Sequence, residues 1–136
     1  MSDNQIPLLE DVMTADPVGI EASSSLAKAE ELMNRSEVQH LAVTDASGPI
    51  GIISKQDLLR ISSPAHSLAD DDLLVADILR IRHYIADVSD PLDRVLDIMV
   101  NDGIEAVLVL NDGELAGIFT STDACSLLAE LLKKGI

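Results

Sequence analysis

The chain has very few aromatic side chains and a single cysteine. Among its 136 residues, only Tyr84 and Phe119 are aromatic. Apolar residues nevertheless make up 47% of the chain, which predicts a folded protein with an aliphatic core. Cys125 stands alone, so the chain cannot form an intramolecular disulfide, and its cysteine content does not indicate an oxidising compartment.

Basic residues are also scarce, with 9 Lys and Arg against 24 Asp and Glu, and the formal net charge is −15. A surface of this charge repels nucleic-acid phosphates and anionic membranes. Base stacking would also require aromatic side chains that the chain lacks. The composition therefore predicts a protein that binds neither nucleic acid nor membranes.

Long apolar runs are missing as well. No stretch reaches the roughly 18 residues that a helix needs to span a bilayer. The first residues, Met-Ser-Asp-Asn-Gln, have neither the basic nor the apolar region of a signal peptide. We therefore expect a soluble cytoplasmic protein.

The clearest positive feature is an internal repeat. Shifting the chain by 66 residues aligns it with itself without a gap and gives nine identities. The identical pairs are Leu8/Leu74, Asp11/Asp77, Ser23/Ser89, Leu26/Leu92, Met33/Met99, Val43/Val109, Gly51/Gly117, Ile52/Ile118 and Asp57/Asp123. The sequence therefore predicts two copies of one unit.

Each copy shows the same order of elements: a short helix, an extended segment, an amphipathic helix, two strands and a final helix. In the first copy we expect these at 8–13, 18–20, a helix carrying Leu26 to Met33, 41–44, 50–53 and from Lys55. In the second copy we expect them at 74–79, 84–86, a helix carrying Leu92 to Met99, 106–110, 115–119 and from Ser121. Ser24 and Asp90 are the expected N-caps, with Pro91 at the first helical position.

These elements define the predicted fold class, α/β (α+β). We place a first β-α-β-β-α unit at 1–62, a linker at 63–73 and a second unit at 74–136. One unit alone has little core, so the two units are expected to pack sheet to sheet about a pseudo-twofold axis.

The second strand of each copy leads into a motif of glycine, hydroxyl residue and aspartate. The motif reads Gly51-Ile-Ile-Ser-Lys-Gln-Asp57 in the first copy and Gly117-Ile-Phe-Thr-Ser-Thr-Asp123 in the second. It suits a capping box, although that box prefers Glu or Gln because Asp is short for the return reach. It equally suits a nucleotide site, with phosphate at the helix start and ribose hydroxyls on the carboxylate. The residues alone leave both interpretations open.

A doubled unit of this kind resembles a tandem pair of CBS domains, also called a Bateman module, from about Leu8 to Leu132. Asp11-Val-Met-Thr14 followed by Pro17 matches the opening of that family, and 45–48 matches its turn. Ala42 departs from the family, which often has proline there. The resemblance implies a regulatory module that binds an adenosine-containing ligand.

The resemblance also implies roles for individual residues. Asp57 with Ser54, and Asp123 with Thr120 and Thr122, would hold ribose or phosphate. Adenine would lie among aliphatic side chains and backbone groups, in pockets lined by both copies, and the resemblance does not assign these segments to one aspartate. The residues concerned are Thr14, Ala15, Pro17, Val18, Val38, His40, Leu41 and Ala42, then Arg80, Arg82, His83, Tyr84, Ile104, Ala106 and Val107.

The copies differ at a basic turn, where Thr14, Asp16 and Pro17 of the first copy become Arg80, Arg82 and His83 in the second. This turn could be solvated and paired with the acidic residues 70–72. It could instead clamp a phosphate, because arginine binds phosphate oxygens in pairs. The clamp would favour a phosphorylated ligand.

Other reactive side chains form no site. Cys125 is expected to be a small buried apolar residue, and His40, His66 and His83 lack the spacing of metal ligands. No catalytic set can be assembled, so we expect neither an enzyme nor an obligatory cofactor or metal. AMP, ADP, ATP or an S-adenosylmethionine-type compound is the expected ligand.

The last helix carries an apolar stripe of Ala124, Leu127, Leu128, Leu131 and Leu132 that needs a partner. Modules similar to this one dimerise through such helices, so the resemblance implies a homodimer through helices that include 121–134. A structural or dimerisation module with vestigial pockets is the competing hypothesis. The regulated partner protein is not identified by the sequence.

Overall fold

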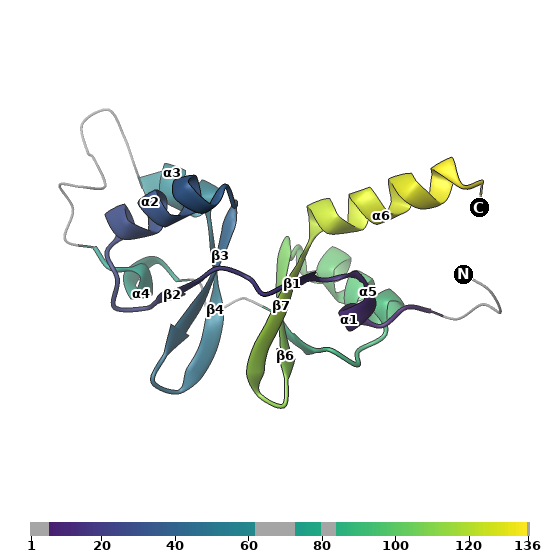
Figure 1. The fold of residues 1–136 in the computed structure, drawn as a ribbon, viewed down its shortest axis with the longest axis horizontal. Coiled ribbons are helices and arrows are strands. Elements are labelled where there is room, and N and C mark those ends of the chain that lie inside the picture. The colour runs from purple at the N-terminus through teal and green to yellow at the C-terminus, as the bar shows by residue number, and fades with distance from the viewer. Residues whose placement is uncertain (1–5, 62–72, 80–83, 136) are drawn as a thin grey trace. The chain divides into compact units, whose positions relative to one another are not determined.

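The computed structural model describes residues 6–61, 73–79 and 84–135 (Figure 1). The chain divides into two compact units, Pro17–Ile81 and a second unit of Met1–Asp16 with Arg82–Ile136. In the described ranges these units hold two sheets and six helices, so the predicted α+β fold class is confirmed. Packing of one sheet on the other stays a prediction.

The unit Pro17–Ile81 has a three-stranded sheet in the order β2-β3-β4. Strand β2 runs parallel to β3, and β3 is antiparallel to β4. The helices are joined to the strands in the order that the sequence predicts. The bounds are β2 Gly19–Glu21, α2 Leu26–Ser36, β3 His40–Asp45, β4 Gly48–Ser54, α3 Lys55–Ile61 and α4 Val75–Ile78.

The other unit has a four-stranded sheet in the order β1-β7-β6-β5. Strand β5 runs parallel to β6, whereas β7 is antiparallel to both of its neighbours. The bounds are α1 Leu9–Val12, β1 Thr14–Ala15, β5 Tyr84–Asp87, α5 Leu92–Asp102, β6 Ala106–Asn111, β7 Glu114–Thr120 and α6 Ser121–Lys133.

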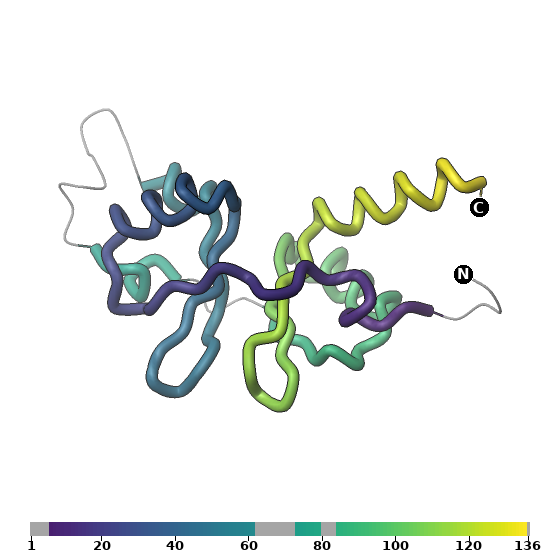
Figure 2. Tube along the Cα trace, viewed as in Figure 1, coloured from purple at the N-terminus to yellow at the C-terminus, as the bar shows by residue number. Residues whose placement is uncertain are grey.

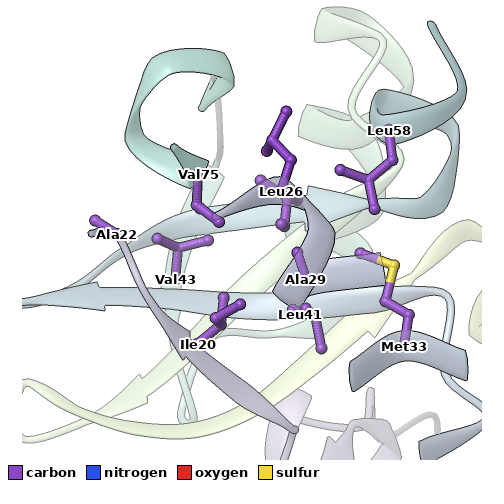
Figure 3. Close-up of a cluster of buried hydrophobic side chains, with 10 residues drawn as sticks. Ile20, Ala22, Leu26, Ala29, Met33, Leu41, Val43, Leu58 and Val75 are labelled. Atoms are coloured by element: carbon purple, nitrogen blue, oxygen red, sulfur yellow. The ribbon is translucent and has the colours of Figure 1, made fainter. Parts of the chain in front are cut away.

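Each unit has a mainly aliphatic core, because the apolar stripe of its amphipathic helix faces the sheet. In the unit Pro17–Ile81, Leu26, Ala29 and Met33 of α2 pack with Leu41 and Val43 of β3 (Figure 3). The equivalent stripe of α5 packs with Val107, Val109 and Phe119 in the other unit. The stripes that the sequence predicts are therefore the core-facing surfaces.

The short helices exchange places between the copies. Leu9 of α1 is fully buried in the core that α5 covers, and Val75 of α4 is fully buried in the core that α2 covers. Figure 2 shows the purple segment of residues 6–16 among the green and yellow elements. A packing unit therefore does not coincide with one copy of the repeat.

Matching backbone hydrogen bonds hold the two exchanged helices. The N–H of Leu9 donates to the carbonyl of Asp90 (3.0 Å), and the N–H of Val75 donates to the carbonyl of Ser24 (2.8 Å). The compact units thus differ from the sequence boundaries 1–62 and 74–136, which follow the repeat along the chain. Residues 62–72, most of the predicted linker, lie outside the described part of the chain.

The predicted helix starts are wrong by one residue. Ser25, rather than Ser24, is the N-cap of α2, and its hydroxyl accepts a hydrogen bond from the N–H of Lys28 (3.1 Å). Pro91 occupies the N-cap of α5 rather than its first helical position. The side chain of Asp90 instead accepts from the N–H of Asp87 (3.0 Å), because Asp favours such turns.

Candidate functional site

The hydroxyl and the aspartate of each motif are joined by two hydrogen bonds. The N–H of Ser54 donates to Asp57 Oδ2 (2.8 Å), and the N–H of Asp57 donates to Ser54 Oγ (3.2 Å). The second copy repeats this with Thr120 and Asp123 at 2.9 and 3.2 Å. Both halves of the capping box are formed, so Asp is long enough for the return reach.

The acid-to-backbone bond is shared with helices that carry no hydroxyl residue at the N-cap. Asp11 accepts from the N–H of Leu8 (2.9 Å), and Asp77 accepts from the N–H of Leu74 (2.8 Å). This bond therefore reports helix capping and is not by itself a sign of a ligand. The chemical distinction of the two motifs is the hydroxyl of Ser54 or Thr120 beside the carboxylate.

Each strand-to-helix junction is held against the segment that precedes the neighbouring strand. The N–H of Lys55 donates to the carbonyl of Gln39, and the N–H of Ser121 donates to the carbonyl of Glu105, both at 2.9 Å. In the sheets, His40 lies opposite Ser54 and Ala106 lies opposite Thr120. The structure therefore brings the predicted adenine segments 38–42 and 104–107 beside the hydroxyls.

The compact units divide the predicted site residues into two sets. One set, in the unit Pro17–Ile81, is Pro17, Val18, Val38, His40, Leu41, Ala42, Ser54 and Asp57. The other set is Thr14, Ala15, Tyr84, Ile104, Ala106, Val107, Thr120, Thr122 and Asp123. The opening segment of the first copy is thus split after Asp16, and Thr14 and Ala15 lie with Asp123.

Strand β1 causes this split, and the sequence patterns did not predict it. Thr14 pairs with Ile118 and Ala15 pairs with Gly117. Two residues are too short for any periodicity to be recognised. Gly117 is the residue whose identity fits this pairing, because it has no Cβ where β1 approaches. A Cβ there would lie 2.6 Å from Met13 Sδ.

Some predicted residues face the cores. The side chains of Leu41 and Val107 belong to the two core clusters and are fully buried. They can offer a ligand only backbone groups in this conformation. Thr14 and Ala15 are exposed, and Thr120 is buried.

The two aspartates differ in their charged neighbours, which the sequence analysis missed. Asp57 Oδ1 lies 3.5 Å from a guanidinium nitrogen of Arg60, one helical turn later. The position equivalent to Arg60 in the second copy is Ser126. Among the residues that the structure describes, Asp123 forms no ion pair. The three-residue spacing of Asp57 and Arg60 in the predicted helix is the sequence feature that indicates this ion pair.

Tyr84 lies at the start of β5 and packs against the core of its unit. Burial raises the pKa of its phenol, and the negative charge of Asp90 raises it further, whereas Arg94 lowers it. The phenol is therefore neutral at physiological pH and can donate a hydrogen bond.

Three predicted site residues, Arg80, Arg82 and His83, lie outside the described residues, as does His66. Within residues 6–61, 73–79 and 84–135, no three potential metal-ligating side chains gather. The same ranges contain no helix long and apolar enough to cross a membrane.

The prediction for Cys125 is wrong, because its side chain is exposed. Ala124 and Leu127 make the contacts of α6 with the core, and Cys125 lies on another side of the helix. Leu128 and Leu132 are also exposed, at 53% and 62%. The predicted apolar stripe of α6 is thus only partly covered.

Curated relatives are much longer than this chain. The chain is 30% identical over 116 residues to a homoserine O-acetyltransferase of Methanocorpusculum labreanum, and the match covers 83% of the chain and 22% of the relative. It is 27% identical over 120 residues to an L-aspartate semialdehyde sulfurtransferase of Methanocaldococcus jannaschii, covering 87% and 22%. The chain spans about a fifth of each of these relatives.

Solved structures share the fold over almost the whole chain. A CBS domain pair in complex with 5′-methylthioadenosine and S-adenosyl-L-methionine is 25% identical, with a TM-score of 0.75 and coverage of 89% of this chain and 98% of that one. An uncharacterised conserved protein from Pyrococcus horikoshii is 26% identical, with a TM-score of 0.74 and coverage of 92% and 94%. CBSX2 in complex with AMP, 22% identical with a TM-score of 0.74 and coverage of 92% and 98%, shows the fold alone.

The family described as CBS domain matches residues 9–64 and 75–130. These two ranges contain most of the chain and correspond to the two copies of the repeat. The chain therefore belongs to the CBS domain family and carries a tandem pair of these domains.

Proposed function

We propose that this chain is a regulatory module of the cytoplasm that binds an adenosine-containing compound and thereby controls the activity or assembly of a partner. The observation that carries the proposal is the hydroxyl–aspartate pair at the same strand-to-helix junction in both copies. A CBS domain pair of the same fold, solved with 5′-methylthioadenosine and S-adenosyl-L-methionine, supports the class of ligand.

The hydrogen-bond pattern leaves suitable groups for such a ligand. Asp57 Oδ2 accepts from the N–H of Ser54, whereas Oδ1, which lies 3.5 Å from the Arg60 guanidinium, has a further lone pair that can accept from a ribose diol. The hydroxyl of Ser54 acts as an acceptor for the N–H of Asp57, so its own proton can be donated to a ribose or phosphate oxygen. Asp123 and Thr120 offer the same groups.

The structure supplies matched controls for a binding test. Asp57→Asn and Asp123→Asn remove the charge but keep an oxygen that can accept from the N-cap N–H. Asp11→Asn and Asp77→Asn make the same change at helix caps without a hydroxyl partner. The first pair should lose ligand binding, whereas the second pair should keep it.

Calorimetry and thermal shift with AMP, ADP, ATP, S-adenosylmethionine and 5′-methylthioadenosine provide the measurement. At a ligand concentration of about 100 times Kd, stabilisation should be about 2.7 kcal/mol. Asp57→Asn and Asp123→Asn should each weaken binding at their own site by at least about tenfold, the loss of a charged hydrogen-bond acceptor. Binding of none of the five compounds, or equal effects of all four substitutions, contradicts the proposal.

A structural or dimerisation module is the second candidate, and the exposed Leu128 and Leu132 of α6 favour it. If α6 forms a homodimer interface, Leu128→Glu should shift the chain from dimer to monomer in sedimentation experiments. Val100, 80% exposed on α5, provides the control substitution Val100→Glu, which should leave assembly unchanged. A chain that stays monomeric at all concentrations contradicts this candidate.

A further inference from the structure

The carboxylates of the two proposed sites carry different partners. Asp57 is only 19% exposed, and its Oδ1 faces the guanidinium of Arg60, which is 54% exposed. In the second copy the equivalent turn has Asp123 and Ser126. Asp57 thus has a cationic neighbour, whereas Asp123 has none among the residues that the structure describes.

Neighbouring positions change charge in the same direction. Lys55, whose Nζ donates to Asn34 Oδ1 at 3.2 Å, is replaced by Ser121. Gln39, whose carbonyl accepts from the N–H of Lys55, is replaced by Glu105.

The formal charges of these four positions make the second copy the more negative one. In the first copy the formal charges total +1, from Asp57, Arg60, Lys55 and the neutral Gln39. In the second copy they total −2, from Asp123, Glu105 and the neutral Ser126 and Ser121. Glu37, two residues before Gln39, has Gly103 as its counterpart. Including this pair changes the totals to 0 and −2, so the second copy remains more negative.

We propose that Arg60 determines the ligand preference of the two sites. The Asp57 site takes a phosphorylated adenosine compound, and the Asp123 site takes an uncharged or cationic one such as a thioadenosine or a sulfonium compound. This inference rests on the proposed function, since it assumes that both aspartates bind ribose. It adds that the sites differ in ligand class.

Electrostatics explains why the Asp57 site, rather than the Asp123 site, should prefer the phosphorylated ligand. An aspartate that accepts the ribose hydroxyls brings the phosphate of a nucleotide within several ångströms of its own negative charge. Arg60 offsets that repulsion in the first copy, and its guanidinium can turn to the phosphate because it is about half exposed. The second copy has no such side chain at that position, so a phosphate there meets two negative charges.

The test compares AMP with 5′-methylthioadenosine, which lacks the phosphate, by calorimetry on the full chain. Asp123→Asn isolates the first site, and Asp57→Asn isolates the second. At the first site, Arg60→Ser should lower the ratio of AMP affinity to methylthioadenosine affinity by about fivefold to tenfold. Arg60→Lys should keep that ratio within about twofold, because the charge remains.

The reciprocal substitution tests the second site. Ser126→Arg should raise the same affinity ratio at the Asp123 site by about fivefold, and added salt should reduce the gain. An unchanged ratio in both Arg60→Ser and Ser126→Arg overturns the role of Arg60 while leaving ligand binding itself intact. A wild-type chain that binds neither compound overturns the proposed function and this inference together.

Discussion

Leu9 and Val75 hold equivalent positions in the two copies, and each is fully buried in the core formed by the other copy. Figure 3 shows Val75 beside Leu26 and Val43, which come from the first copy. Because of this exchange, each core contains residues from both copies of the repeat. It follows that one copy of the repeat does not form a complete core by itself.

Truncating either exchanged side chain is expected to destabilise the protein. Leu9→Ala should lower the free energy of unfolding by about 2–4 kcal/mol, because it leaves a cavity in a packed core. Val75→Ala removes fewer atoms and should cost about 1–3 kcal/mol. Urea unfolding followed by circular dichroism measures both values, and Leu74→Ala, at a partly exposed neighbour, is the control.

Fragments of the chain test the exchange more directly. A fragment of residues 17–79 contains the complete core of its unit, including Val75, and should show cooperative thermal unfolding. A fragment of residues 1–62 lacks Val75 and should be largely unfolded. Equal cooperativity of the two fragments would show that the exchanged helix is dispensable.

The sequence predicted the elements of the repeat well because their signals are local. The stripe through Leu26 and Met33, and its copy in the second half, face the cores as expected. The exchange of α1 and α4 could not be predicted in this way. A helix of four residues, as in Leu9–Val12, fits either core by its own pattern, and only the tertiary structure selects one.

The candidate site was predicted in part. The spacing from Ser54 to Asp57 and from Thr120 to Asp123 correctly predicts the paired hydrogen bonds. The same spacing cannot separate a cap from a ligand site, because both need a hydroxyl and an acid one turn apart. Arg60 could not be predicted from the repeat, because the repeat is defined by identical residues, whereas Arg60 is a position at which the copies differ.

Gly117 is expected to tolerate no side chain. A Cβ at this position would lie 2.6 Å from Met13 Sδ and 2.7 Å from the carbonyl oxygen of Thr14. Gly117→Ala should therefore destabilise the protein by about 1–3 kcal/mol through overpacking. Chemical denaturation measures the change. Adding Met13→Ala should restore only part of the stability, since the contact with Thr14 remains, and full recovery would contradict this explanation.

The C-caps of α2 and α5 have the same left-handed backbone conformation but different residues, Glu37 and Gly103. Glu37 has φ 56° and ψ 42°, and Gly103 has φ 64° and ψ 38°. A side chain is strained in this left-handed conformation, so Glu37→Gly should stabilise the protein by about 0.5–1 kcal/mol. Gly103→Ala should destabilise it by a similar amount. A loss of stability in Glu37→Gly would show that the glutamate side chain makes a compensating contact.

The stability of the protein should fall at alkaline pH because the pKa of Tyr84 is raised in the folded state. Burial and the charge of Asp90 raise the pKa of the phenol, so the folded state holds this proton more tightly than the unfolded chain does. The corresponding stability is present below the pKa of the unfolded chain. It is lost as the pH rises through the pKa of the folded protein.

Tyr84 is the only tyrosine of the chain, so phenolate absorbance follows this one group. The native protein should titrate at higher pH than the same chain in urea. Asp90→Asn should lower the native pKa by removing a negative charge, and Arg94→Gln should raise it by removing a positive one. Opposite shifts from these two substitutions separate the charges from burial, which both variants retain. A native tyrosine that titrates with the unfolded one would mean that the phenol is solvated.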